Sequence, residues 1–328
     1  MSKKILVTGG TGFLGSGLAR KLVMLGHDVK VFDNNNRGSL EKIKDFKDEV
    51  EVINGDVRNF DDVKKAVDNC DVIFHLAFVN GTKYFYEKPE LVLDVGVKGA
   101  LNLLECSLKS KINTFIMASS SEVYNNPTTI PTTEEERAII TDVKNPRFSY
   151  AGGKLISELL TLNYMRKSAI RDLIFRPHNV FGPDMGHEHV IPELLKKIYI
   201  SSNGLKDKEC IVQIQGSGNE TRAFCYIDDA VDQLVCLLNN GKKGELYNIG
   251  VQKEINIRQL ILEISKILNM NIIIKNTKIL QGSTPRRCPD ISKIKSLGYK
   301  EINNFDKGLE KTINWYLRKF KNTKNVQK

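Results

Sequence analysis

The sequence predicts an α/β protein built on a doubly wound parallel sheet, with a smaller, mostly helical lobe added to it. From the N-terminus to Pro177, short apolar runs alternate with stretches whose apolar residues recur at helical spacing. The first run closes on glycines, and no run approaches the ~20 residues that a membrane-spanning helix needs. Strands alternating with helices favour a parallel sheet covered on both faces.

The order of the elements is βαβ, repeated. KKILVT predicts the first strand, and FLGSGLARKLVMLGH predicts a helix because its apolar residues share one helical face. The longest helical pattern is LVLDVGVKGALNLLECSLK, residues 91–109. Further strands are expected in DVKVFD, VEVING, DVIFHLA, TFIMASS and DLIFRP.

Beyond Pro177 the alternation loosens, which indicates a second lobe. A turn in GPDMG precedes a helix from about Pro192, a strand in CIVQIQ, a helix from Tyr226 and strands in ELYNIG and NIIIK. We expect a main domain of residues 1–176 plus about 226–250, a lobe of about 177–225 plus 251–321, and a polar tail of 322–328.

Composition limits the partners and the compartment. The net charge of +10 comes from scattered lysines, so no nucleic-acid partner is expected, and the positive potential favours a small anionic substrate. The six cysteines form no C-x-x-C pair and mostly stand in apolar runs, which argues against disulfides and a metal site. No signal-peptide core follows Met-Ser-Lys-Lys, so we expect a cytoplasmic protein without a membrane partner.

The stretch TGGTGFLG joins the first strand to the first helix and spaces Gly9, Gly12 and Gly15 three residues apart. Such a turn lets the backbone approach a pyrophosphate at the N-terminus of the helix. Asp33 ends the second strand, where a carboxylate accepts ribose hydroxyls and repels a 2′-phosphate. The pattern predicts NAD as the cofactor, while nearby Arg37 leaves NADP open.

A tyrosine and a lysine stand four residues apart twice, as Tyr150 and Lys154 in FSYAGGK and as Tyr84 and Lys88 in YFYEK. A phenol is a poor base at neutral pH, and a nearby ammonium favours its ionised form. One helical turn puts both side chains on the same face. Spacing alone does not choose between the two copies.

In the order of its motifs, nearly the whole chain resembles the extended short-chain dehydrogenase/reductases of the nucleotide-sugar epimerase/dehydratase family. The resemblance implies a Rossmann domain, bound NAD and a nucleotide-diphosphate sugar as substrate. The motifs are TGGTGFLG, Asp33, GDV at 55–57, HLA at 75–77, SSSEVY at 119–124, YAGGK, FRPHNVFGP at 175–183 and TRAFCYIDDAV at 221–231.

The resemblance selects Tyr150 and Lys154, because the family's pair follows a serine-bearing strand and begins a long helix. Tyr150 would take the proton of a sugar hydroxyl as hydride leaves the same carbon, Ser120 would hydrogen-bond that hydroxyl, and Lys154 would hold the nicotinamide ribose. Tyr84 or Phe85 would line the sugar pocket. The implied cofactor contacts are Gly9, Gly12, Phe13, Leu14, Gly15, Asp33, Asn34, Asp56, Val57, Leu76, Ala77, Tyr150, Lys154 and Pro177.

The reaction after oxidation at carbon 4 depends on Glu122. A 4,6-dehydratase of the family has a glutamate there as acid/base at carbon 5, whereas a 4-epimerase needs no further base. The resemblance favours the dehydratase narrowly over the epimerase; a decarboxylase, which resembles it at the same place, and a non-catalytic NAD-binding scaffold come third. Gly96 and Asn125 depart from the family's usual Asn and Gly.

Further residues match substrate-binding positions of the family. His187, Glu188 and His189 are expected to border the sugar pocket without holding a metal, because their spacing fits no helical ligand pair. A homodimer formed through two helices is the family's expectation. The implied substrate contacts are Ser120, Ser121, Asn179, Arg222 and either Arg286 or Arg287, with Arg286 preferred.

Overall fold

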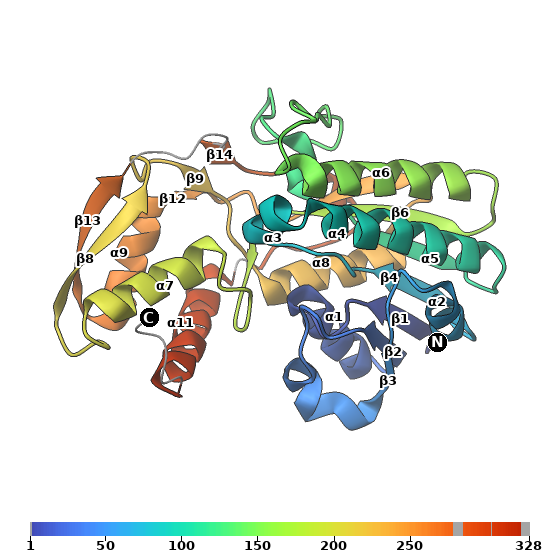
Figure 1. Cartoon of the computed structure of the whole chain (residues 1–328), viewed down its shortest axis with the longest axis horizontal. Helices are drawn as coiled ribbons and strands as arrows, with labels where there is room; N and C mark the ends of the chain where they lie inside the picture. Colours follow the sequence, from blue (N-terminus) through green and yellow to red (C-terminus); the bar gives the residue numbers. More distant parts are fainter. Residues whose placement is uncertain (1, 278–284, 303, 323–328) are drawn as a thin grey trace.

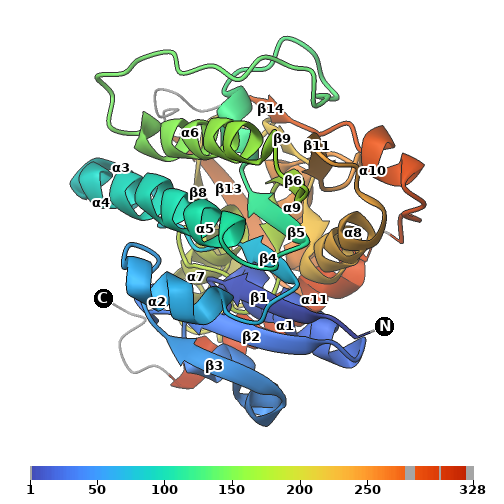
Figure 2. The same ribbon diagram turned by 90° about the vertical axis from the view of Figure 1, so that its right-hand side faces the viewer.

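The computed structural model describes residues 2–277, 285–302 and 304–322. Its centre is a seven-stranded parallel sheet in the order β11-β6-β5-β4-β1-β2-β3 (Figures 1 and 2). The predicted fold class is confirmed. The strands are β1 (Lys4–Thr8), β2 (Asp28–Asp33), β3 (Val50–Asn54), β4 (Val72–His75), β5 (Thr114–Ala118), β6 (Arg171–Pro177) and β11 (Glu245–Ile249).

Helices cover both faces of the sheet because its strands present apolar side chains to both. In β1, Ile5 and Val7 belong to one buried core and Leu6 to the other, as the alternation of side chains along a strand requires. The first face carries α1 (Phe13–Met24), α8 (Ile227–Asn240) and α10 (Ser292–Ser296). The second carries α2 (Phe60–Val67), α3 (Thr82–Glu87), α4 (Pro89–Leu93), α5 (Gly99–Leu108) and α6 (Phe148–Met165).

The helical stretch expected at residues 91–109 is interrupted. Between α4 and α5 lies a π-helical turn, η2 (Asp94–Lys98), with Gly96 at its centre. A side chain at position 96 would overlap the ring of Phe78, so the turn accommodates a phenyl group. π-Helical turns often occur at functional sites.

The strand order reverses at β1, since β2 and β3 extend to one side of it and β4, β5, β6 and β11 to the other. In open α/β sheets, ligands bind at the carboxyl ends of the strands at such a point. The 3₁₀ helices η1 (Leu40–Glu49) and η3 (Ser121–Tyr124) follow β2 and β5 at these ends.

A second group of elements lies beside the sheet (Figure 1) and forms a third core, which includes Phe181, Phe224, Leu260 and Phe320. Ile291 and Ile294 pack instead in the first core, because α10 lies against the edge strand β11. The division into domains stays a prediction, and tail residues 323–328 lie outside the described residues. The elements are β7 (Val180–Phe181), α7 (Val190–Ser201), β8 (Glu209–Gln215), β9 (Thr221–Arg222), β10 (Cys225–Tyr226), β12 (Ile255–Asn256), α9 (Ile257–Leu268), β13 (Asn271–Thr277), β14 (Arg286–Arg287) and α11 (Phe305–Asn322).

Within the described ranges, none of the helices has the length and apolar character needed to cross a membrane. The same residues contain no group of three or more His, Cys, Asp and Glu side chains arranged to hold a metal ion.

Candidate active site

The glycine turn lies at the carboxyl end of β1, where the strand order reverses. Gly9 has a φ of +68°, and a Cβ there would come within 2.8 Å of the Ala77 nitrogen. A Cβ on Gly15 would overlap the Gly9 carbonyl oxygen. These positions exclude side chains and form a backbone cradle at the N-terminus of α1, which fits the pyrophosphate of a dinucleotide.

Asp33 lies beside this cradle at the end of β2. Its Oδ2 accepts a hydrogen bond from the Thr11 amide at 3.1 Å, and its Oδ1 accepts one from the Asn35 amide at 2.8 Å. The guanidinium of Arg37 stacks 4.6 Å from the centre of the Tyr84 ring. A carboxylate fixed by backbone amides fits the ribose of NAD and opposes the 2′-phosphate of NADP.

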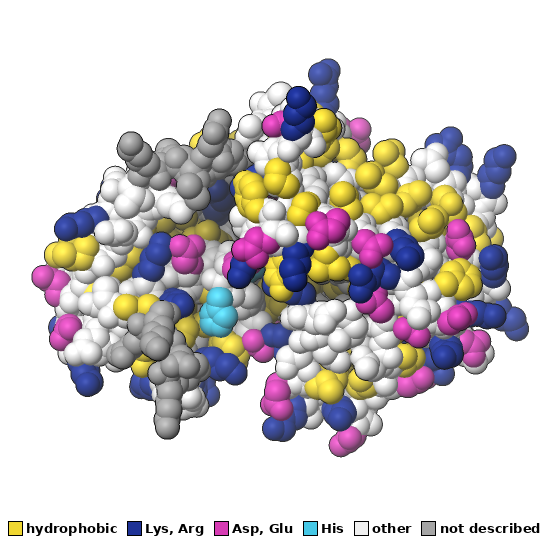
Figure 3. Space-filling model, in the orientation of Figure 1, with side chains coloured by type: hydrophobic (Ala, Val, Ile, Leu, Met, Phe, Trp, Pro, Cys, Tyr) yellow, Lys and Arg dark blue, Asp and Glu magenta, His cyan; other side chains and the backbone are white. Residues whose placement is uncertain are grey.

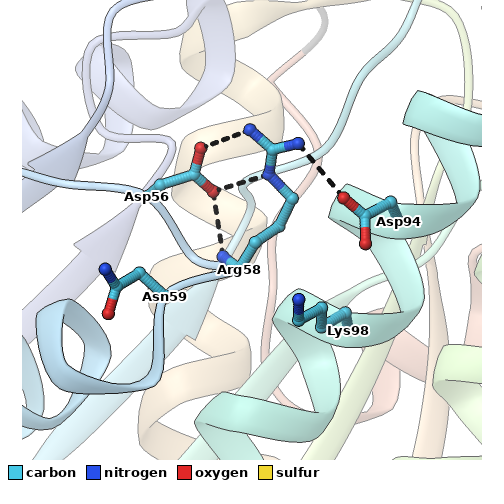
Figure 4. Close-up of a pocket in the computed structure, with 5 residues that line it drawn as sticks. All are labelled: Asp56, Arg58, Asn59, Asp94 and Lys98. Atoms are coloured by element: carbon cyan, nitrogen blue, oxygen red, sulfur yellow. Dashed lines mark hydrogen bonds and ion pairs between the residues drawn. The ribbon is translucent and has the colours of Figure 1, made fainter.

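Asp56, expected to contact adenine, is already fully engaged by protein groups. Its Oδ1 accepts from the amide and Nε of Arg58, and its Oδ2 accepts from Nη2 of Arg58 and from Asn34. Figure 4 shows Arg58 between Asp56 and Asp94, to which its Nη1 donates at 3.1 Å. These bonds to Arg58 lower the pKa of Asp56 to about 2. Four bonds fill the acceptor sites of a carboxylate, so an adenine amino group would have to replace one.

The other expected cofactor residues border the same edge of the sheet. Val57 is buried, and its carbonyl accepts a hydrogen bond from Asn102 on α5. Ala77 donates its amide to Thr8 Oγ1. Phe13 and Leu14 open α1, Leu76 follows β4, and Pro177 ends β6.

Tyr150 and Lys154 are both buried on the sheet-facing side of α6. The Lys154 ammonium donates a 2.6 Å hydrogen bond to the Ala118 carbonyl and lies 5.9 Å from the centre of the Tyr150 ring. The ring of Phe85 stacks on Tyr150 at 4.9 Å. In the other Tyr-x-x-x-Lys stretch, Lys88 is exposed at the junction of α3 and α4.

Burial sets the protonation of this pair. Burial raises the pKa of Tyr150 to about 12, and a hydrogen bond with Ser120 acts against the rise. Burial lowers the pKa of Lys154 to about 7, opposed by the negative charge of Glu158. His75 is buried next to Thr8, and burial lowers its pKa to about 3, so it is a neutral packing residue.

Glu122 lies in a pocket with Tyr150, Phe85, Arg147 and Arg287. It forms an ion pair with Arg287, and its Oε2 lies 4.0 Å from Arg147. Burial opposes its ionisation, but the charge of Arg287, followed by those of Arg147 and Arg222, outweighs burial and lowers the pKa of the carboxyl group. The pocket therefore holds a carboxylate among several guanidinium groups.

The structure separates the two neighbouring arginines of β14. Arg287 reaches Glu122, whereas Arg286, half exposed, pairs with Glu254 on the surface. The pocket thus contains Arg287 and not the preferred Arg286. Ser120 caps η3 by accepting the Glu122 amide at 3.1 Å, and Ser121 begins η3.

Residues of the second group of elements complete the site. The side-chain nitrogen Nδ2 of Asn179 is buried without a hydrogen-bond partner among the described residues. Buried polar groups are normally hydrogen-bonded, so this nitrogen could donate to a bound ligand. Arg222 is next to Arg287 in the register of β9 and β14. His187 packs on Tyr316, and Glu188 approaches Gly81.

Sequence reasoning missed two side chains, Arg147 and Phe78. Arg147 stands three residues before Tyr150, and Phe78 directly follows the HLA stretch. Closeness to these motifs is the only feature of the sequence that points to Arg147 and Phe78. Their roles depend on which residues face them in the fold, and the sequence does not show that.

A Rossmann sheet with a glycine cradle, a fixed acid at the end of β2 and a buried Tyr-Lys pair defines an NAD-dependent enzyme of the extended short-chain dehydrogenase/reductase type. The chain belongs to the NAD dependent epimerase/dehydratase family, whose model matches residues 5–250.

Three relatives illustrate the range of activities in the family. The chain is 30% identical, over 96% of its length and 98% of the relative, to the UDP-N-acetyl-alpha-D-glucosaminuronate decarboxylase of Bacillus cytotoxicus. It is 28% identical, over 100% of its length and 93% of the relative, to the human dTDP-D-glucose 4,6-dehydratase. The crystal structure of UDP-glucuronic acid 4-epimerase from Bacillus cereus, in complex with UDP-glucuronic acid and NAD, matches with a TM-score of 0.84 and 27% identity, covering 96% of this chain and 99% of that one.

Proposed function

We propose that the protein is an NAD-dependent decarboxylase of a nucleotide-linked hexuronic acid. The observation that supports this activity most is the group of guanidinium ions around Glu122, beside Tyr150. The charges of Arg147, Arg222 and Arg287 all lower the pKa of the Glu122 carboxyl group. Guanidinium groups gathered in this way also suit the carboxylate of a substrate, because each can donate two parallel hydrogen bonds to it.

The oxidation step is common to every candidate reaction. Bound NAD supplies the acceptor for the hydride of carbon 4. Tyr150 takes the proton of the carbon 4 hydroxyl, Ser120 hydrogen-bonds the same oxygen, and the Lys154 charge favours the ionised phenol. If the bound cofactor returned the hydride to the sugar, no net NADH would be released.

Decarboxylation needs little more from the protein. After oxidation, the carboxylate at carbon 6 is β to the carbon 4 ketone. The bond between carbons 5 and 6 breaks, carbon dioxide leaves, the electron pair is delocalised into the carbonyl, and the resulting enolate takes a proton from water at carbon 5. The arginines bind and orient the carboxylate, and no base is required at carbon 5.

A 4,6-dehydratase remains the second candidate because Glu122 occupies the place of an acid/base. Water loss requires a base at carbon 5 and a proton donor for the hydroxyl leaving carbon 6. Glu122 is paired with Arg287, and position 121 is a serine, so the described pocket offers one carboxyl group for two tasks. Two of the relatives above are named for hexuronic acids, which supports a uronate as the substrate, and one of these two is named as a decarboxylase.

The test is a product assay on the purified protein with its NAD. UDP-glucuronate, UDP-N-acetylglucosaminuronate, UDP-glucose and dTDP-glucose are incubated separately, and products are followed by mass spectrometry. We expect loss of carbon dioxide from a uronate. Loss of water from a neutral sugar would establish the dehydratase instead, and a product of unchanged mass with an inverted carbon 4 would establish an epimerase.

A further inference from the structure

The Lys154 ammonium lies against an aromatic face. Its Nζ is 3.9 Å from the centre of the Phe78 ring, and the lysine is 3% exposed. The Phe78 ring also meets Tyr150 edge-on at 5.2 Å. An ammonium over a phenyl face is attracted by the negative face of the ring, and more strongly where water is excluded.

The ring fits there because two glycines leave room for it. A Cβ on Gly96, in the π turn η2, would overlap the ring, and a Cβ on Gly153 would lie 3.1 Å from Cζ of Phe78. Gly152 is different, since a Cβ there would meet only Ile140, at 3.9 Å. Phe78 therefore occupies space that side chains at positions 96 and 153 would fill, whereas Gly152 leaves no space for it.

Few charged groups compete with the ring for the ammonium. On α6, Glu158 faces it, but this carboxylate is held by Arg176 of β6 at 2.6 and 2.8 Å and by Ser119. Burial disfavours the charged forms of both Tyr150 of α6 and His75 of β4. Among the described residues, the ammonium thus has the Ala118 carbonyl as its hydrogen-bond acceptor and Phe78 as the nearer of two aromatic rings, the Tyr150 ring being 5.9 Å away.

We propose that Phe78 is a positioning residue, which holds the Lys154 ammonium in place by a cation–π contact, in space provided by Gly96 and Gly153. Phe78 acts on the oxidation step that every candidate reaction shares. The inference is therefore independent of whether the enzyme is a decarboxylase.

The test measures the titration of Lys154 directly in the NAD-bound protein. Lysines are labelled with ¹³C at Cε, and the Lys154 signal is assigned as the one lost in Lys154→Met. Phe78→Leu removes the aromatic face, and Gly96→Ala displaces the ring. Both should lower the pKa of Lys154 by about one unit and move the alkaline limb of the activity profile by the same amount. Gly152→Ala, the matched glycine change, should move neither.

An unchanged Lys154 titration in folded Phe78→Leu would overturn the proposal, as would an equal shift in Gly152→Ala. If Phe78→Leu fails to fold, replacement of Phe78 by pentafluorophenylalanine keeps the shape of the ring and withdraws charge from its face. The pKa of Lys154 should then fall as in Phe78→Leu, and a constant value would refute the cation–π contact.

Discussion

Lys154 places a titratable amine inside the protein, whereas Lys88 of the second Tyr-x-x-x-Lys stretch is at the surface. The folded-state pKa of Lys154, about 7, lies below its ordinary value of 10.5 because burial disfavours the charge. Between these values the unfolded chain binds a proton that the folded chain has released. The stability of the fold therefore rises with pH across this window, and the lysine costs stability below it.

Lys154→Met should accordingly slow turnover and stabilise the protein. We expect kcat to fall about 10²–10⁴-fold, and the free energy of unfolding to rise by about 1–3 kcal/mol at neutral pH. The gain should shrink as the pH approaches 10.5, as measured by denaturant unfolding at several pH values. Lys88→Met is the control and should change neither quantity; a less stable Lys154→Met variant would contradict the role of burial.

Arg287 and Arg286 offer a matched pair of neighbouring arginines. Arg287→Met should reduce decarboxylation about 10²–10³-fold, because it removes a substrate-binding cation and the nearest ion-pair partner of Glu122. Arg286→Met should stay within about fivefold of the wild type, since exposed ion pairs contribute little. Steady-state kinetics with the active uronate distinguish them. Equal losses in both variants would argue that Arg287 does not contact the carboxylate.

At the scale of the elements, the turn between β1 and α1 has no room for a side chain at Gly9 or Gly15. Gly15→Ala would force a methyl group onto the Gly9 carbonyl, so we expect a folded protein that purifies without NAD. Gly17→Ala, in the same helix, would meet side-chain atoms of Ile227 and Val231, the nearest being Cδ1 of Ile227 at 3.0 Å, and should retain the cofactor. The NAD content is measured after denaturation and chromatography. Full NAD content in Gly15→Ala would contradict the role of this turn in binding the cofactor.

The elements that the sequence predicts best are those with a local cause. The glycine turn, Asp33 and the strands of the sheet follow from patterns within a few residues. Arg287 could not be distinguished from Arg286, because neighbours in a strand point to opposite sides and the register of β14 on β9 decides which one faces Glu122. The position of the Phe78 ring could likewise not be predicted, because it depends on Gly96 and Gly153, which belong to two other elements.

At the scale of the whole molecule, the candidate pocket is formed by both parts of the protein. Tyr150 and Glu122 come from α6 and η3 at the sheet, while Arg222 and Arg287 come from the short strands β9 and β14 beside it. Two of the three arginines that act on Glu122 thus come from a different part of the chain than Glu122 itself, while Arg147 precedes α6. Substrate that bridges the two parts would hold them together.

The outer face of α4, α5 and α6 carries an apolar surface that we expect to bury in a homodimer. Figure 3 shows hydrophobic side chains gathered over these helices, which lie side by side in Figures 1 and 2. A two-fold axis would pair this surface with itself, the commonest arrangement of soluble homodimers. The exposed apolar residues are Leu93, Leu108, Ile156, Leu159 and Tyr164.

A single charge should therefore separate the subunits. Leu159, 55% exposed on α6, lies within this surface, so Leu159→Glu should give a monomer at micromolar concentration in analytical ultracentrifugation. Leu262, 56% exposed on α9, is the matched control, and Leu262→Glu should remain dimeric. A wild-type protein that sediments as a monomer would refute the dimer. If Leu262→Glu dissociated the dimer and Leu159→Glu did not, the interface would lie at α9 instead.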